Sequence, residues 1–151
     1  MVITDPNPFR LDLARRLGAT RTVNISIESL TDVKSELGMK EGFDIALEMS
    51  GHPAGISDIL DHTSHGARVS LLGIFPDKLE IDFEKVIFKG LVLKGIYGRE
   101  MFETWYKMSS MVRAGLDPSA VITHEFDASD FQNAFETMLS GKSGKVVLHW
   151  G

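Results

Sequence analysis

The stretch "FDIALEM", residues 43–49, is the strongest strand signal in this chain. Three consecutive apolar residues, Ile45, Ala46 and Leu47, stand at its centre. A continuous apolar run of this length is typical of a strand that is covered on both faces, as in parallel sheets. The segment that follows, "SGHPAG" at residues 50–55, supplies a turn. We therefore expect residues 43–49 to form a strand with helices on both of its faces.

Strand-like and helix-like segments alternate on either side of this stretch. The segment from residue 8 to residue 17 shows helical spacing, because Phe9, Leu13 and Leu17 recur at i, i+4 and i+8 before Gly18. Similar patterns predict helices over residues 29–37, 54–63 and 82–90, and strands over residues 2–4, 22–25, 67–73 and 91–97. Strands separated by helical crossovers pair in parallel, so the expected fold class is α/β with a mostly parallel sheet.

The pattern changes after residue 97. We expect a long helix over residues 101–114, a strand over 121–126, a helix over 128–141 with Ser129 as a possible cap, and a last strand over 145–150. Periodicity leaves open whether this helix-strand-helix-strand segment extends the sheet or packs elsewhere. An apolar stripe at helical spacing indicates a core or subunit contact rather than a cofactor site. Its members are Met101, Trp105, Met108 and Met111.

Bulk composition excludes several classes of protein. With 151 residues and 43% hydrophobic content, the chain can bury one sizeable core. The formal charge of -5 argues against nucleic-acid and anionic-membrane partners. There is no cysteine, which excludes disulfides and thiolate metal sites, and no apolar run of about 18 residues. A soluble protein of the cytoplasm is the expectation.

A carboxylate follows the first strand of the chain. Asp5 ends the run "VIT" at residues 2–4 and precedes the turn signal "PNP". In dinucleotide-binding sheets an acid at the end of the second strand binds the adenosine ribose, and its charge would repel the 2′-phosphate of NADP. The alternative is that Asp5 only serves the turn before the helix. The glycine-rich loop G-x-G-x-x-G, which should lie about 20 residues earlier, occurs nowhere in the sequence.

Several runs of the chain resemble a known family. They are "VITDPNPFRLDLARRLGAT", "EGFDIALEMSGHP", "GARVSLLGI", "VIFKGLVLKGIYGREMFETWYKM" and "SGKSGKVVL". Together they are similar to the C-terminal part of the zinc-dependent L-threonine dehydrogenases, a branch of the medium-chain dehydrogenases/reductases, and "KGIYGREMFETWYKM" is the most specific of them. The resemblance implies oxidation of L-threonine to 2-amino-3-ketobutyrate with NAD. It also implies a homo-oligomer, usually a tetramer, with zinc between a cofactor domain and a GroES-like catalytic domain.

The resemblance implies cofactor-binding residues at both ends of NAD. At the adenosine end it supports Asp5 as the ribose acid and adds Arg10, whose guanidinium can stack on adenine or bond the ribose. A first-turn arginine on a solvated face is the alternative for Arg10.

At the nicotinamide end, the resemblance implies two strand termini. Leu72, Gly73 and Ile74 follow one strand, and Gly73 would let the backbone come close to the nicotinamide ribose. Ile96 and Tyr97 end the next strand, where main-chain groups would hold the carboxamide. Without the resemblance, the glycine is a turn and the other residues are core.

The resemblance also implies what this chain lacks. The family's zinc ligands and proton-relay groups lie in an N-terminal half, so we expect no catalytic and no metal-ligating residue here. The residues agree, because the five histidines show no metal-ligand spacing and no cysteine can assist them. We therefore expect the chain to be inactive in isolation. The open alternatives are a non-catalytic nucleotide-binding or structural fragment, and a methyltransferase-like sheet.

The expected architecture is a truncated Rossmann-type, doubly wound sheet. Residues 1–100 would form a partial NAD-binding domain, and residues 101–151 a segment that in the family returns to the catalytic domain. In the strand order 3-2-1-4-5-6 the absent first strand is central, so the strands at 2–4 and 43–49 should each lose a neighbour. They would either pair directly or borrow a strand from another copy, giving an edge-paired dimer.

Overall fold

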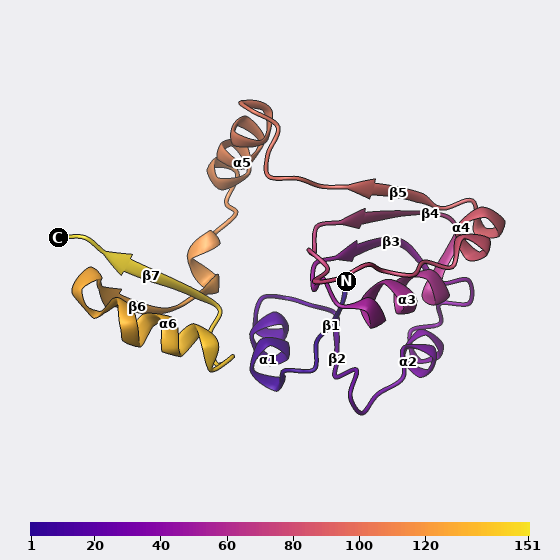
Figure 1. Cartoon of the computed structure of the whole chain (residues 1–151), viewed down its shortest axis with the longest axis horizontal. Helices are drawn as coiled ribbons and strands as arrows, with labels where there is room; N and C mark the ends of the chain where they lie inside the picture. The colour runs from indigo at the N-terminus through magenta and orange to yellow at the C-terminus, as the bar shows by residue number, and fades with distance from the viewer. The chain divides into compact units, whose positions relative to one another are not determined.

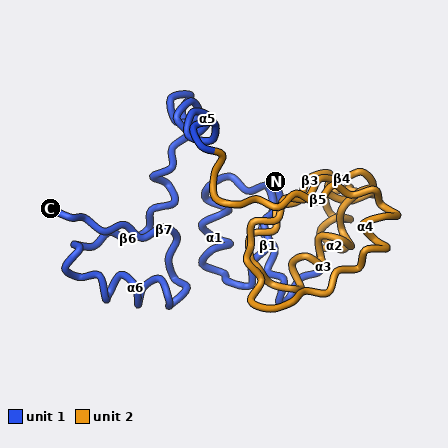
Figure 2. The backbone as a smooth tube through the Cα atoms, turned by 45° about the horizontal axis from the view of Figure 1, so that its top comes forward, with its two compact units in different colours: residues 1–29, 101–151 blue, residues 30–100 orange.

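The computed structural model describes residues 1–151 (Figure 1). The chain folds into two compact units, which Figure 2 distinguishes by colour. Unit 1 comprises residues 1–29 and 101–151, and unit 2 comprises residues 30–100. Both units combine parallel strands with helices. None of the helices is long and apolar enough to cross a membrane.

Unit 2 contains a three-stranded sheet in the order β3-β4-β5. Its strands are β3 (Phe43–Glu48), β4 (Thr63–Leu71) and β5 (Val92–Gly95), and both neighbouring pairs are parallel. Its helices are α2 (Leu30–Glu36), α3 (Pro53–His62) and α4 (Phe83–Lys89). The expected α/β class and parallel pairing are confirmed. The largest boundary difference is at β4, which begins at Thr63 rather than at residue 67.

Local sequence signals explain where the helices of unit 2 begin and end. Pro53 opens α3, and the side chain of His52 accepts a hydrogen bond from a backbone N–H of the first turn. Asp82 caps α4 in the same way, and α4 ends at Gly90, which has a left-handed backbone with φ 60°. These signals lie within a few residues of the boundaries that they set.

The core of unit 2 lies on one face of its sheet. Helix α3 packs against β3 and β4, and α4 packs against β4. The residues at their centre are almost completely buried: Ile56, Leu60, Ala67 and Val69.

The expectation that residues 43–49 are covered on both faces is wrong for this structure. The side chains of Ile45 and Leu47 are 69% and 59% exposed. Side chains alternate between the two faces of a strand, and the helices of unit 2 cover the face that carries Ala46, which pairs with the buried Val69. The apolar run does not distinguish the two faces, because all three residues at its centre are hydrophobic.

Unit 1 contains two separate pairs of parallel strands. The first pair is β1 (Val2–Thr4) with β2 (Arg21–Val23), joined by α1 (Pro8–Arg16). The second pair is β6 (Ile122–Asp127) with β7 (Lys145–His149), joined by α6 (Phe131–Leu139). The remaining elements are α5 (Glu103–Arg113) and two short 3-10 turns, η1 (Pro118–Val121) and η2 (Ala128–Asp130).

The segment after residue 97 does not extend the sheet of unit 2. Strands β6 and β7 pair only with each other. Ser129 does not cap α6, because it lies in η2, and Asp130 occupies the cap position.

Helix α5 has no buried residue. The apolar stripe at Met101, Trp105, Met108 and Met111 is exposed, so its interpretation as core is wrong, and its interpretation as a subunit contact stays a prediction.

Strands β1 and β3 belong to different sheets. β1 pairs only with β2, and β3 pairs only with β4, so each of β1 and β3 has one open edge. The prediction that residues 2–4 pair directly with residues 43–49 is wrong. Each of these strands pairs with the strand to which its own helical crossover connects it. Borrowing of a strand from another copy stays a prediction.

Two basic groups lie near the C-terminal end of α3. The ammonium group of Lys89 donates hydrogen bonds to the backbone carbonyls of Leu60 (2.5 Å), Asp61 (3.0 Å) and Thr63 (3.0 Å). His62 is the last residue of α3. Burial lowers the pKa of His62, and the positive charge of Lys34 lowers it further. Folding therefore favours the neutral imidazole.

We predict that His62 makes the folded state less stable as the pH falls. The pKa of His62 is lower in the folded state than in the unfolded state. In the window between these two values the unfolded chain binds the extra proton, so the free energy of unfolding decreases from about pH 7 to about pH 5. His62→Gln should reduce this decrease in urea unfolding curves at the two pH values, with the exposed His65→Gln as control. An equal pH dependence in both variants would contradict the prediction.

Candidate functional site

The candidate cofactor residues follow the carboxyl ends of strands, where ligands bind in open α/β sheets. Asp5 and Arg10 lie in unit 1, after β1. The other group lies in unit 2 and consists of Leu72, Gly73 and Ile74 after β4, with Ile96 and Tyr97 after β5. The seven residues thus form two clusters, one in each unit.

Asp5 is held by both its backbone and its side chain. Its backbone N–H donates to the carbonyl of Val23 at 3.1 Å. Its Oδ1 accepts from the backbone N–H of Asn7 at 2.7 Å, and its Oδ2 lies 3.6 Å from Nη1 of Arg10. The side chain remains 24% exposed. Asp5 therefore does serve the turn, but a carboxylate has about four acceptor positions, so capacity remains for further donors.

Asn7 fixes the turn between Asp5 and helix α1. Its Oδ1 accepts from the backbone N–H of Phe9 at 2.9 Å, which makes Asn7 the helix cap, and Pro8 opens the helix. Its Nδ2 donates to the carbonyl of Gly141 at 2.7 Å. The turn that carries Asp5 is thereby tied to the loop before β7. Arg10, in the first turn of α1, has a side chain that is 56% exposed.

The second cluster is formed where β4 and β5 end side by side. Leu71 pairs with Gly95, and the backbone N–H of Ile96 donates to the carbonyl of Leu71 at 2.8 Å. The backbone N–H groups of Leu72 and Gly73 donate to the carbonyl of Glu48 at 2.9 and 3.1 Å. The side chains of Leu72, Ile74, Ile96 and Tyr97 are all exposed. Three strand ends therefore present these residues on one edge of the sheet of unit 2.

Packing within the protein explains why residue 73 is a glycine. A Cβ atom at Gly73 would lie 2.2 Å from Oε2 of Glu48 and 2.2 Å from the backbone nitrogen of Gly51. Real side chains do not tolerate such distances from fixed atoms. Close approach of a nicotinamide ribose to Gly73 stays a prediction. The contacts with Glu48 and Gly51 are sufficient to explain why residue 73 is a glycine.

Sequence reasoning missed Glu48, the last residue of β3. Its residue surface is 2% exposed, and its Oε1 accepts from the backbone N–H and the hydroxyl of Ser50 at 2.9 and 2.5 Å. The arrangement matches that of Asp5, because each acid stands at the end of a strand and accepts from the N–H two residues later. The sequence signal that could have identified Glu48 is therefore an acidic residue between a strand and a turn.

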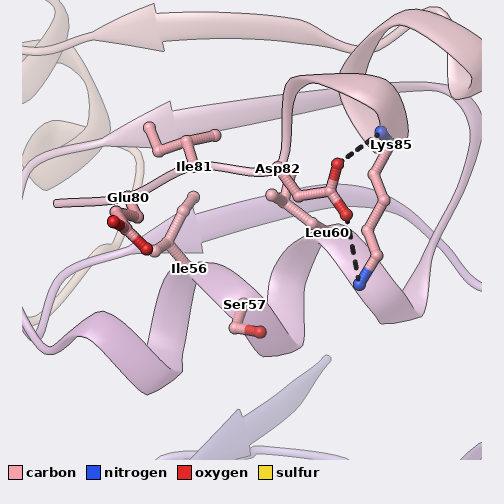
Figure 3. Close-up of a pocket in the computed structure, with 7 residues that line it drawn as sticks. All are labelled: Ile56, Ser57, Leu60, Glu80, Ile81, Asp82 and Lys85. Carbon is pink, nitrogen blue, oxygen red and sulfur yellow. Dashed lines mark hydrogen bonds and ion pairs between the residues drawn. The ribbon is translucent and has the colours of Figure 1, made fainter.

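A separate pocket of about 360 Å³ lies in unit 2 between α3 and the segment that leads into α4 (Figure 3). Its lining residues are Ile56, Ser57, Leu60, Glu80, Ile81, Asp82 and Lys85. Two of the charged groups already have partners: Asp82 accepts from the first turn of α4, and Lys85 bonds Asp61, which raises the pKa of Lys85. None of the candidate cofactor residues lines this pocket.

The residues of this chain do not fit a zinc site. The chain has no cysteine, and nowhere do three histidine, aspartate or glutamate side chains come together as a metal would require. Nε2 of His149 lies 2.6 Å from Oε2 of Glu125, but these two groups have no third donor beside them.

Parallel strands joined by helices, with an acid at the end of β1, define an α/β protein with the Rossmann-like arrangement of dehydrogenases. Residues 1–114 match the zinc-binding dehydrogenase family, and the chain belongs to this family.

Relatives with curated names extend the match to the rest of the chain. The L-threonine 3-dehydrogenase of Aeromonas salmonicida is 60% identical over 150 residues, and that of Idiomarina loihiensis is 59% identical over 150 residues. Each match covers 99% of this chain and 44% of the relative, so the chain spans less than half the length of these enzymes.

Solved structures support the fold. The 2R,3R-butanediol dehydrogenase of Bacillus subtilis superposes with a TM-score of 0.86 at 19% identity, covering 99% of this chain and 43% of the other. An E. coli short chain alcohol dehydrogenase in complex with NADH superposes with a TM-score of 0.84 at 20% identity, covering 99% and 44%.

We predict that Asn7→Ala destabilises unit 1. The substitution removes the cap of α1 and the hydrogen bond to Gly141, and together these losses should lower the free energy of unfolding by about 1 to 3 kcal/mol. Asn7→Asp keeps the cap acceptor and loses the donor to Gly141, so it should cost less. Denaturant titrations followed by circular dichroism measure the stability of both variants. Equal stability of Asn7→Ala and the unmodified chain would show that the cap and the bond to Gly141 do not stabilise unit 1.

Proposed function

We propose that this chain forms the NAD-binding portion of an L-threonine 3-dehydrogenase, which oxidises L-threonine to 2-amino-3-ketobutyrate. The observation that carries the proposal is the 60% identity over 150 residues to the enzyme of Aeromonas salmonicida. When bound, NAD would supply the hydride acceptor for this oxidation. The chain's own residues bind and orient the cofactor, while zinc and the proton relay belong to parts of the enzyme outside this chain.

Asp5 and Arg10 serve the adenosine end in this proposal. The free acceptor positions of Asp5 accept hydrogen bonds from the ribose hydroxyls, and its negative charge disfavours the 2′-phosphate of NADP. The turn bond from Asn7 and the ion pair with Arg10 hold the carboxylate in one orientation. The exposed guanidinium of Arg10 is then available to the adenine or the ribose.

The strand ends of unit 2 serve the nicotinamide end. Leu72 and Ile74 have exposed side chains at the end of β4, with Gly73 between them, and Ile96 and Tyr97 have exposed side chains at the end of β5. The N–H groups of Leu72, Gly73 and Ile96 are used within the protein, so other main-chain groups of these segments would hold the carboxamide.

The proposal extends to organisation and assembly. Residues 1–100 form the partial cofactor domain, and residues 101–151 form a segment that returns toward the catalytic domain. Exposed apolar side chains on α5 and open strand edges on β1 and β3 are compatible with a homo-oligomer. A non-catalytic nucleotide-binding or structural role is the alternative function.

We predict that the chain supports threonine oxidation only when it is joined to the rest of such an enzyme. In a chimaera, this chain replaces the 150 matching residues of the Aeromonas salmonicida enzyme. The chimaera should reduce NAD with L-threonine, because the missing Lewis acid and base are then present. The isolated chain should show no turnover and should bind NAD no tighter than about 1 mM. An inactive but folded chimaera would favour the structural alternative.

We predict that Asp5→Ser in this chimaera weakens the preference for NAD over NADP. Loss of the carboxylate removes both the ribose acceptor and the repulsion of the 2′-phosphate, so the ratio of the two kcat/KM values should fall by about tenfold or more. The control is Asp12→Ser, which removes the same charge from α1 at the ion pairs with Arg15 and Arg16. An unchanged ratio in Asp5→Ser would show that Asp5 does not contact the ribose.

A further inference from the structure

Glu48 connects two loops at the carboxyl edge of the sheet of unit 2. Its side chain holds the loop after β3, because Oε1 accepts from Ser50 and also from the backbone N–H of Gly51 at 3.1 Å. Its main-chain carbonyl holds the segment after β4 through the N–H groups of Leu72 and Gly73. One residue therefore ties together segments that are more than 20 residues apart in the sequence.

Three glycines surround the carboxylate of Glu48. A Cβ atom at Gly73 would lie 2.2 Å from Oε2, and one at Gly55, in the first turn of α3, would lie 3.1 Å from Oε1. The third is Gly51, which has φ 68° and passes so close to Ile74 that a Cβ atom would lie 2.4 Å from its carbonyl oxygen. A side chain at residue 73 would therefore displace the carboxylate, one at residue 55 would crowd it, and one at residue 51 would collide with the backbone of Ile74.

We propose that Glu48 is a positioning residue for the nicotinamide end of the cofactor. It acts by holding the backbone of residues 72–74 against the loop at residues 50–52. This inference rests on the proposed function, since it assumes that residues 72–74 contact NAD. Glu48 itself is buried and does not touch the cofactor.

The chemistry of the site favours a carboxylate for this task. Two backbone N–H groups and one hydroxyl converge on it, and a carboxylate is an acceptor without donors of its own when it is ionised. Hydrogen bonds to a charged acceptor are stronger than those between neutral groups. Removal of the side chain leaves the loop at residues 50–52 without its acceptor, so the close contacts of Gly51 with Gly73 and Ile74 lose their support.

The test compares Glu48→Ala with the unmodified protein in two settings. In the chimaera, KM for NAD should rise by about tenfold, because residues 72–74 lose the support of the loop that Glu48 holds. KM for threonine should change by less than about twofold, because the loops face the cofactor rather than the alcohol. In the 151-residue chain without cofactor, amide hydrogen exchange should accelerate at Ser50 and Gly51, whose N–H groups lose their acceptor. It should also accelerate at Leu72 and Gly73, which keep the main-chain carbonyl of Glu48 but lose the support of the loop.

Two further variants separate positioning from general stability. Glu48→Gln keeps an acceptor oxygen of the same reach and should restore most of the affinity for NAD. Asp82→Ala removes a cap of similar kind from α4, which lies beside the beginnings of the strands in Figure 1, and should lower the melting temperature without changing KM for NAD. If Glu48→Ala does not fold, Gly55→Ala crowds Oε1 from the side of α3 and should raise KM for NAD by about threefold.

The outcomes distinguish the two proposals. An inactive chimaera with native Glu48 would overturn the proposed function, and hydrogen exchange at Leu72 and Gly73 would then decide whether Glu48 holds this segment. Unchanged exchange at Leu72 and Gly73 would overturn the positioning role. An active chimaera in which Glu48→Ala behaves like Asp82→Ala, with lower stability and the same KM for NAD, would also overturn it.

Discussion

Parallel pairing of β3, β4 and β5 is the constraint on which the candidate nicotinamide site depends. Because all three strands run in the same direction, their carboxyl ends meet at one edge. Each chain segment that leaves this edge must turn there, and its first backbone N–H groups need acceptors. The carbonyls of Glu48 and Leu71 supply them for the segments after β4 and β5. The geometry of the edge is therefore a consequence of the strand ladder.

Two acidic residues occupy equivalent positions at strand ends but have different surroundings. Asp5 and Glu48 each accept a hydrogen bond from the backbone two residues later. Asp5 keeps a side chain that is 24% exposed, whereas Glu48 is enclosed by Gly51, Gly55 and Gly73. The first can meet a ligand directly, and the second can act only through the loops that it holds. The two proposed roles therefore differ because of solvent access and not because of residue type.

The helical crossovers decide which strands pair. Helix α1 brings β2 beside β1, and α3 brings β4 beside β3, so local connections account for each of these ladders. No such connection joins β1 to β3, and each keeps an open edge. Packing also decides which face of the sheet is covered, because the side chains of Ile45 and Leu47 are exposed although both are apolar. The apolar pattern of a strand shows which side chains can be buried. The packing of the folded chain decides which of them are buried.

The sequence by itself determined the features that depend on near neighbours. The turns at Asn7 and Pro8, the cap at Asp82 and the alternation of strands and helices were all predictable, because capping and periodicity act over a few residues. The family resemblance also pointed to Asp5. The tertiary structure alone decided the burial of Glu48, the exposure of Ile45 and the close contact between Gly51 and Gly73, since these depend on which distant segments meet.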